Sequence, residues 1–326
     1  MTVPIDWLCL HGFTGTPADW QLVLDRVDGV GRSYCPILLG HGAGEGGSEV
    51  DGDDSQSTII EPVSPAPGRG DAPAYPKRPL RGRPEPREGR HIVAWGVSPR
   101  RHRVDLSAKA PASPAQNSFE AEVDRLAAWL ASRTDEPVAL AGYSLGGRLA
   151  LGLLVRHPER FCAAVLVGSH AGLRDATARA ERRAADEVLA DSLDRDGIEA
   201  FVDRWQELPL FASQKRLAEP VQAAQRARRL AHDPSGLATS LRRVGAGAMP
   251  DLWDRLAAIE VPIALVVGEL DTKFRTLGEA MVQSWPAASL EVVPGVGHNV
   301  VLEAPEHLAR VMGQLALGMA PVEVCR

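Results

Sequence analysis

Short apolar runs alternate with longer amphipathic stretches along most of this chain. Helical periodicity predicts helices at Phe119–Arg133, where Ser118 is a suitable N-cap, and at Gly146–His157. Alternating strands and helices are typical of a mostly parallel sheet with helices on both faces, so we expect an α/β fold. The runs expected to form strands are Ile5–Gly12, Ser33–Gly40, Pro137–Ser144, Ala163–His170, Pro262–Glu269 and Ser289–Gly295.

Two segments interrupt this alternation. Residues 43–116 begin acidic and rich in glycine and serine and continue rich in proline and arginine, a composition that buries little apolar surface. We expect a disordered insertion there; a small folded element and a translated frameshift or gene-model error are the alternatives. Residues 173–244 are helical in pattern without a strand candidate, which predicts a helical cap inserted into the core. The core is then formed by residues 1–42, 117–172 and 245–326.

Composition limits the classes of partner. The 326 residues are 44% hydrophobic and carry a net charge of −6, which is ordinary for a globular protein and gives no indication of binding to nucleic acid or membranes. No apolar run approaches the ~20 residues of a membrane helix, and the N-terminus lacks the features of a signal peptide. The four cysteines show no paired spacing. We therefore expect a cytoplasmic protein without a metal. Because the first predicted strand begins at Ile5, we also expect a trimmed sheet that lacks leading antiparallel strands.

The stretch Gly142-Tyr143-Ser144-Leu145-Gly146 has the pattern G-x-S-x-G. It follows a predicted strand and precedes a predicted helix, as in a nucleophile elbow, where glycines permit a sharp turn that presents the serine at the helix N-terminus. A structural serine is the alternative interpretation.

A serine nucleophile needs a base and an orienting carboxylate. Asp271 and His298 each follow a predicted strand, and the order Ser144, Asp271, His298 is that of the α/β-hydrolases. An oxyanion hole needs two backbone N–H donors. Phe13, in the loop after the first strand, and Leu145 are the candidates.

Two further positions near these motifs are polar. His41 follows the second predicted strand, and its place favours a structural role over a catalytic one. Arg148 lies one helical turn after Ser144, on the same face of the helix. It either binds a substrate carboxylate or is an ordinary surface arginine, and helix geometry leaves both possibilities open.

Six stretches together resemble one family, the 2-succinyl-6-hydroxy-2,4-cyclohexadiene-1-carboxylate synthases of menaquinone biosynthesis. The G-G-R after Ser144, the P-L-F-A-S motif and D-x-K-F are the most particular to it, and the resemblance excludes the 43–116 segment. The stretches are Leu10–Trp20, Gly142–Leu151, Gly168–Leu173, Leu208–Gln214, Gly268–Phe274 and Gly297–Glu306.

The resemblance implies a cofactor-independent lyase on an α/β-hydrolase fold. Such an enzyme removes pyruvate from a cyclohexene tricarboxylate by proton abstraction and elimination, with Ser144 acting as a base. The substrate would be a small polycarboxylate. Its implied binding residues are Arg148, Arg182 (with Arg183 as the competing register), Tyr143, Trp205, Phe211 and Lys273.

Two other functions remain as alternatives. One is a serine esterase or C–C bond hydrolase in which Ser144 is a true nucleophile. The other is a catalytically inactive binding protein, against which the complete Ser-Asp-His set argues. The oligomeric state is not predicted by any of these features.

Overall fold

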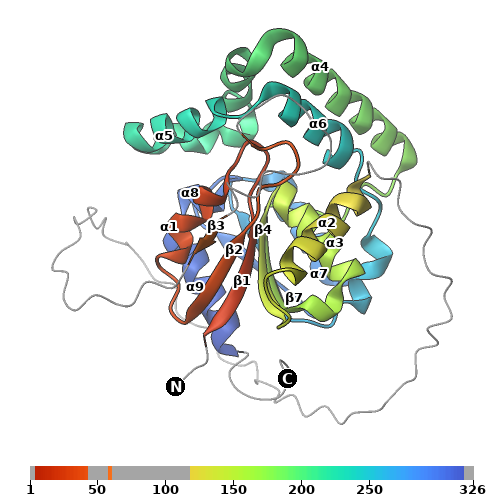
Figure 1. Ribbon diagram of the computed structural model, residues 1–326, viewed down its shortest axis with the longest axis vertical. Coiled ribbons are helices and arrows are strands. Elements are labelled where there is room, and N and C mark those ends of the chain that lie inside the picture. Colours follow the sequence, from red (N-terminus) through yellow and green to blue (C-terminus); the bar gives the residue numbers. More distant parts are fainter. Residues whose placement is uncertain (1–3, 43–57, 61–117, 319–326) are drawn as a thin grey trace, which may run out of the picture. The chain divides into compact units, whose positions relative to one another are not determined.

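The computed structural model describes residues 4–42, 58–60 and 118–318. Their strands form one seven-stranded sheet in the order β3-β2-β1-β4-β5-β6-β7 (Figure 1). Every neighbouring pair is parallel except β2 with β3. The strands are β1 (Ile5–Leu10), β2 (Val30–Cys35), β3 (Thr58–Ile60), β4 (Val138–Tyr143), β5 (Phe161–Val167), β6 (Ile263–Gly268) and β7 (Ala288–Val293).

Helices cover both faces of the sheet, with α1 and α9 on one side and α2, α3 and α7 on the other (Figure 1). Short 3-10 helices lie at Pro17–Trp20, Pro158–Arg160, Pro209–Arg216 and Trp253–Ala258. The α-helices are α1 (Gln21–Leu24), α2 (Phe119–Ala131), α3 (Leu145–Arg156), α4 (Ala176–Gln206), α5 (Glu219–Leu230), α6 (Pro234–Val244), α7 (Thr272–Ser284), α8 (Val300–Glu303) and α9 (Pro305–Gly318).

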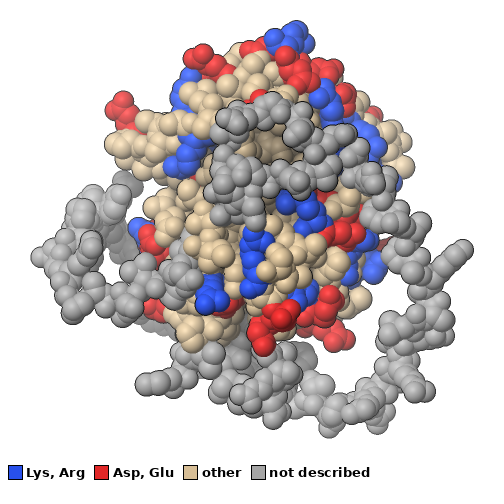
Figure 2. Space-filling view, viewed as in Figure 1, with Lys and Arg blue, Asp and Glu red and all other residues tan. Residues whose placement is uncertain are grey.

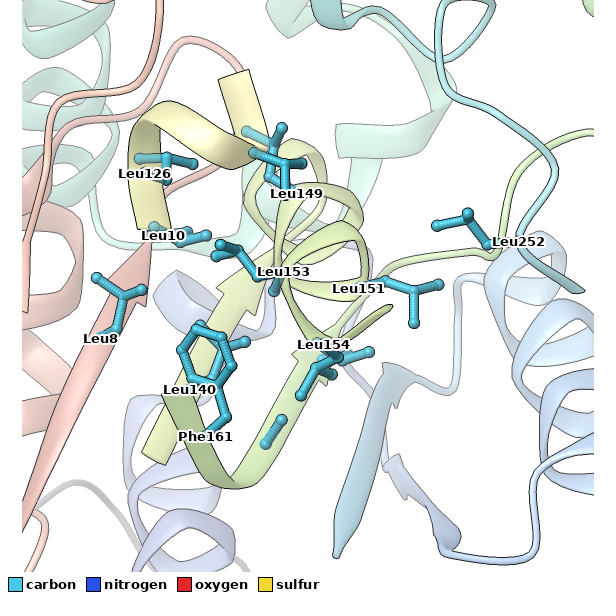
Figure 3. Close-up of a cluster of buried hydrophobic side chains, with 14 of the residues drawn as sticks. Leu8, Leu10, Leu126, Leu140, Leu149, Leu151, Leu153, Leu154, Phe161 and Leu252 are labelled. Carbon is cyan, nitrogen blue, oxygen red and sulfur yellow. The ribbon is translucent and has the colours of Figure 1, made fainter. Parts of the chain in front are cut away.

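The central strands bury side chains on both faces, as parallel strands between two helical layers do. In β1, Leu8 and Leu10 join the cluster under α2 and α3, whereas Trp7 and Cys9 join the cluster on the opposite face. Figure 3 shows the first cluster, in which Leu149 and Leu153 of α3 pack over the sheet. This packing holds α3, and with it the serine at its start, against the centre of the sheet.

Helices α4, α5 and α6 lie between β5 and β6 in the sequence and gather at one end of the sheet (Figure 1). They bury a cluster of their own, which includes Leu193, Phe201 and Leu237. Gly197 interrupts α4 with φ 77°, so the helix has two halves. The segment predicted as the cap at 173–244 contains these helices.

The prediction of a mostly parallel sheet with helices on both faces is confirmed, but two details differ. The second strand is Val30–Cys35, not Ser33–Gly40, because Pro36 has no N–H to donate and ends the pairing. Thr58–Ile60, inside the predicted 43–116 insertion, form β3 at the sheet edge. The rest of that insertion lies outside the described residues.

Surface charge and helix length bear on possible partners. On the described part of the face in Figure 2, acidic and basic side chains are interspersed with uncharged ones. Within residues 4–42, 58–60 and 118–318, no helix is long and apolar enough to cross a membrane.

Candidate active site

Ser144 lies at the sharp turn between β4 and α3. Its backbone has φ 52° and ψ −105°, a strained conformation for a residue with a side chain. The turn is possible because glycines stand two positions before and two positions after Ser144. A Cβ on Gly146 would lie 2.2 Å from the Leu10 carbonyl oxygen. The G-x-S-x-G stretch therefore forms the elbow geometry that its pattern predicts.

Three side chains from three strand ends form one hydrogen-bonded chain. His298 Nε2 lies 3.0 Å from Ser144 Oγ, and His298 Nδ1 lies 2.6 Å from Asp271 Oδ2. Asp271 also accepts the Phe274 N–H at the start of α7, which fixes its carboxylate. Since a carboxylate only accepts, Nδ1 carries the proton and the Nε2 lone pair faces the serine. This is the tautomer that a general base requires.

Gly168, which ends β5, allows His298 to approach the sheet. It has φ 54°, and a Cβ there would lie 2.9 Å from His298 Cε1. We predict that Gly168→Ala lowers the free energy of unfolding by about 1–3 kcal/mol, because the backbone is strained and His298 is displaced. Urea denaturation measures the change. Gly313→Ala in α9, where a Cβ meets only Val27 at 3.9 Å, is the matched control and is expected to be tolerated; equal stability of the two variants contradicts the prediction.

The loop after β1 lies beside the elbow. The carbonyl of His11 accepts the Gly146 N–H at 3.1 Å, which joins this loop to the first turn of α3. The Leu145 N–H is the first of α3, where no acceptor exists one turn earlier. Among the described residues, no loop or turn hydrogen bond takes up the Phe13 N–H. Both candidate oxyanion donors thus belong to segments that meet at Ser144.

Aromatic side chains surround the imidazole of His298. The ring of Phe274 lies 4.6 Å from it, that of Tyr143 5.4 Å and that of Phe211 6.3 Å, measured between centroids. Trp205 contacts Phe211 at 5.7 Å and Phe13 at 5.3 Å. The Lys273 ammonium is exposed and lies 5.6 Å from the Phe274 ring.

Arg148 is a buried cation without an anionic partner among the described residues. It is 9% exposed, and its guanidinium donates to the Val244 carbonyl at 2.9 Å. The pKa of Arg148 is lowered to about 10, mainly by burial and then by the positive charge of Arg182, while the charge of Asp186 acts in the opposite direction. Placing two cations beside one carboxylate favours the binding of an added anion.

Arg182, and not Arg183, belongs to this group. Its Nε donates to Asp186 Oδ1 at 2.8 Å, and Asp186 also accepts the Gly247 N–H. Arg183 is exposed.

Sequence reasoning missed a second buried arginine, Arg229 in α5. It is 4% exposed, and its guanidinium lies 5.3 Å from the Phe211 ring centroid. Burial lowers the pKa of Arg229, Tyr143 and Asp19 raise it, and Arg228 lowers it. Within the described residues the Arg229 guanidinium has no hydrogen bond or ion pair, and its ring contact with Phe211 is the side-chain interaction found for it. The spacing of Val221, Gln225 and Arg229, one helical turn apart, is the signal that marks this face of α5.

Arg229 lines a cavity of about 390 Å³ between α5 and the segment from the β1 loop to α1. Tyr143, which precedes Ser144, and Phe211 also line it, as does Arg228, which pairs with Asp19 at 2.9 Å. Neither Arg148 nor Arg182 lines this cavity. The cavity cations Arg228 and Arg229 are therefore separate from the group formed by Arg148 and Arg182.

The elbow serine, the hydrogen-bonded Ser-His-Asp chain and the capped parallel sheet define the class of α/β-hydrolases. The model of the Alpha/beta hydrolase family matches residues 7–311, and the chain belongs to this family.

More particular relatives share a narrower name. The chain is 42% identical over 177 residues to a Bacillus subtilis (strain 168) protein provisionally named 2-succinyl-6-hydroxy-2,4-cyclohexadiene-1-carboxylate synthase. It is 34% identical over 176 residues to a Salmonella schwarzengrund (strain CVM19633) protein with that name. The matches cover 54% of this chain, and 65% and 67% of the two relatives. This chain thus spans slightly less than two thirds of the Bacillus protein.

Solved structures support the fold. The structure described as MenH from S. aureus superposes with TM-score 0.73 at 23% identity and covers 98% of this chain and 96% of that one. A thermophilic esterase from Thermogutta terrifontis superposes with TM-score 0.65 at 20% identity, covering 98% and 92%. At these identities the likeness establishes the architecture alone, because one fold supports many functions.

Proposed function

We propose that this protein eliminates pyruvate from 2-succinyl-5-enolpyruvyl-6-hydroxy-3-cyclohexene-1-carboxylate to give 2-succinyl-6-hydroxy-2,4-cyclohexadiene-1-carboxylate. The observation that carries the proposal is the buried Arg148 beside Ser144, which has no carboxylate partner among the described residues. A neutral ester gives no reason to retain such a cation. The names of the sequence relatives agree with this choice. A cytoplasmic location is part of the same proposal.

The chemistry uses the triad as a proton relay. His298 takes the Ser144 proton, and the serine oxygen removes the proton from the ring carbon that carries the succinyl group. The electron pair forms the bond to the next ring carbon, the existing ring double bond shifts by one position, and the bond from the ring to the enolpyruvyl oxygen breaks. The leaving enolate takes up one proton and becomes pyruvate, which balances the proton that His298 received and then releases, so that Ser144 and His298 return to their starting states. No water is consumed, and no acyl-enzyme forms.

The negative charge that develops during proton removal spreads onto the succinyl carbonyl oxygen. The N–H groups of Phe13 and Leu145 are proposed to bind that oxygen, since both belong to segments that meet at the serine. Asp271 holds the imidazole in the required tautomer through the 2.6 Å bond to Nδ1.

The substrate carboxylates match the distribution of cations. Arg148 and Arg182 are proposed to bind one carboxylate from the side of α3 and α4, and Arg229 another from the cavity under α5. Lys273 adds a positive charge near Phe274. Tyr143, Trp205 and Phe211 are proposed to form an apolar wall of the site, since Tyr143 and Phe211 line the cavity and Trp205 packs against Phe211.

A direct assay tests the function. Purified protein is given the cyclohexene tricarboxylate, and pyruvate is measured by a coupled dehydrogenase, alongside hydrolysis of a nitrophenyl ester. We expect pyruvate release to exceed ester hydrolysis by orders of magnitude in kcat/KM. Fast ester hydrolysis without pyruvate would instead establish the serine hydrolase alternative.

Arg229→Gln is expected to raise KM for the tricarboxylate by about 10-fold or more, because a charge-assisted contact of about 1.5–3 kcal/mol is lost. Initial-rate kinetics measure it. Arg226→Gln is the matched control, because Arg226 also lies on α5 but pairs with Asp203 at 2.9 Å. An unchanged KM in Arg229→Gln removes this residue from the binding site.

A further inference from the structure

Three buried histidines lie next to the loop that carries Phe13. The ring centroids of His11 and His41 are 5.0 Å apart, and those of His41 and His232 are 5.4 Å apart. The three side chains come from the end of β1, the loop after β2 and the junction of α5 and α6. Within the described parts of the chain, no group of histidine, cysteine and carboxylate side chains is placed to hold a metal ion. All three rings form hydrogen bonds to backbone groups of neighbouring loops.

Two of these histidines join the β1 and β2 loops in reciprocal fashion. His11, in the β1 loop, accepts the Leu38 N–H at Nε2 (3.3 Å), and His41, in the β2 loop, accepts the Thr14 N–H at Nε2 (3.3 Å). Each has its Nδ1 2.9 Å from a carbonyl oxygen, that of Gly12 for His11 and that of Leu39 for His41. Since a carbonyl only accepts, each Nδ1 carries the proton and each Nε2 is an unprotonated acceptor.

The bond from Thr14 has a specific consequence for the site. Thr14 has φ 62°, a left-handed conformation that costs energy for a threonine and persists only when surrounding contacts hold it. Thr14 directly follows Phe13. The peptide group whose N–H bonds to His41 is therefore next to the one that carries the Phe13 N–H, the proposed oxyanion donor. The Phe13 ring also packs edge-on against the His41 ring, with centroids 5.6 Å apart.

His232 connects this arrangement to the cap. Its Nδ1 donates to the His41 carbonyl at 3.1 Å, and the next residue, Asp233, donates its N–H to the Gly42 carbonyl at 3.3 Å. The β2 loop is thus held from both sides, by the β1 loop and by the start of α6.

We propose that His41 is a positioning residue for the oxyanion hole, which it serves by accepting the Thr14 N–H at an unprotonated Nε2 and so fixing the Phe13 N–H. This proposal rests on the oxyanion hole of the proposed function, but not on the identity of the substrate, because an ester hydrolase would use the same hole.

The surroundings keep the His41 ring neutral, with its Nε2 unprotonated. Burial lowers its pKa well below the ordinary value, the charges of His11 and His232 lower it further, and hydrogen bonds to Leu39 and Leu38 raise it. The pKa of His11 is lowered to about 3, again mainly by burial.

The charged groups nearest to the three rings come from neighbouring elements. Asp19 raises the pKa of His232 without overcoming the effect of burial, and Asp19 itself pairs with Arg228. Glu122 of α2 accepts the Leu39 N–H and pairs with Arg125.

The direction of the pH effect follows. Because the folded-state pKa of His41 lies below that of the unfolded chain, the unfolded chain binds the proton first as the pH falls. The contribution of His41 to stability is complete above about pH 6.5, the ordinary pKa of histidine, and is lost as the pH falls toward the folded-state value.

Two substitutions distinguish the hydrogen-bond acceptor of His41 from the space that its ring fills. His41→Phe keeps a buried ring but removes the acceptor, and His41→Gln places an amide oxygen near the position of Nε2 and cannot be protonated near neutral pH. We expect His41→Phe to lower kcat at least about 10-fold with KM within about twofold, and His41→Gln to keep kcat within about threefold. The stability of His41→Gln should also fall less between pH 7 and pH 5 than that of the natural protein. His307→Gln, at a histidine of α9 that contacts Glu291, is the matched control. It should change neither kcat nor the fall in stability between pH 7 and pH 5.

The measurements use both pyruvate release and nitrophenyl ester hydrolysis, together with hydrogen exchange of the peptide that contains Thr14. Absence of pyruvate release would overturn the proposed function alone, since ester hydrolysis and exchange still compare the variants. Exchange at Thr14 should accelerate in His41→Phe and stay slow in His41→Gln. Unchanged kcat and exchange in His41→Phe, or equal losses in both variants, overturn the positioning role. If His41→Phe does not fold, ¹⁵N spectra of the natural protein decide: an unprotonated Nε2 supports the role, and a protonated Nε2 overturns it.

Discussion

Ser144→Ala is expected to lower kcat for pyruvate release by at least about 10³-fold, the scale of loss when a triad member is removed. The serine oxygen is the proposed base toward the substrate carbon, and it lies 3.0 Å from His298 Nε2. KM should change little, because the arginines proposed to bind the carboxylates remain. Steady-state assay of pyruvate measures both constants.

Ser132→Ala, at the exposed end of α2, is the control and should behave as the natural protein does. Mass spectrometry of the natural enzyme during turnover distinguishes a base from a nucleophile. The proposal predicts an unmodified Ser144 throughout, and a substrate-derived adduct on it would favour the hydrolase alternative. Full activity in Ser144→Ala would contradict the catalytic role of the whole triad.

Arg148→Met is expected to lower kcat/KM at least about 10-fold, since a buried charge-assisted bond to the substrate is lost. The same substitution should not lower the stability of the protein. The guanidinium is buried without a carboxylate partner among the described residues, so an apolar side chain of similar length is expected to leave the thermal midpoint unchanged or raised.

Kinetics and thermal denaturation of the same preparations check this pair of outcomes. Arg183→Met, on the exposed side of α4, is the matched control and should leave kcat/KM unchanged. A large drop in the thermal midpoint of Arg148→Met with unchanged kcat/KM would show that the bond to Val244 is the whole purpose of this arginine.

Local patterns were sufficient to predict the elements that the sheet organises. Ser144, Asp271 and His298 each follow a strand, and parallel strands bring their carboxyl ends to one edge, so strand position alone predicts that the three side chains meet. The second strand was misplaced because its first residues, Val30-Gly31-Arg32-Ser33, hold a single large apolar side chain and so lack the apolar run that marks the other strands.

Positions in the cap were harder to predict because they depend on how separate helices pack. Arg182 and Arg183 are neighbours in the sequence, and only the register that places Asp186 under the Gly247 N–H turns Arg182 toward Arg148. Arg229 lies in a run of arginines on α5, most of which pair with acidic residues. Which of them faces a cavity depends on the placement of α5 above α1, a tertiary feature.

The break in α4 at Gly197 separates a charged half of the helix from an aromatic half. The half before it carries Arg182 and Asp186, and the half after it carries Phe201 and Trp205, which meet Phe13 at 6.2 and 5.3 Å. Because the backbone of Gly197 is not helical, the two halves do not form one straight helix. A movement of one half therefore need not move the other half with it. Substitutions after Gly197 can therefore change the shape of the apolar surface around Phe13 without moving the proposed anion site at Arg182.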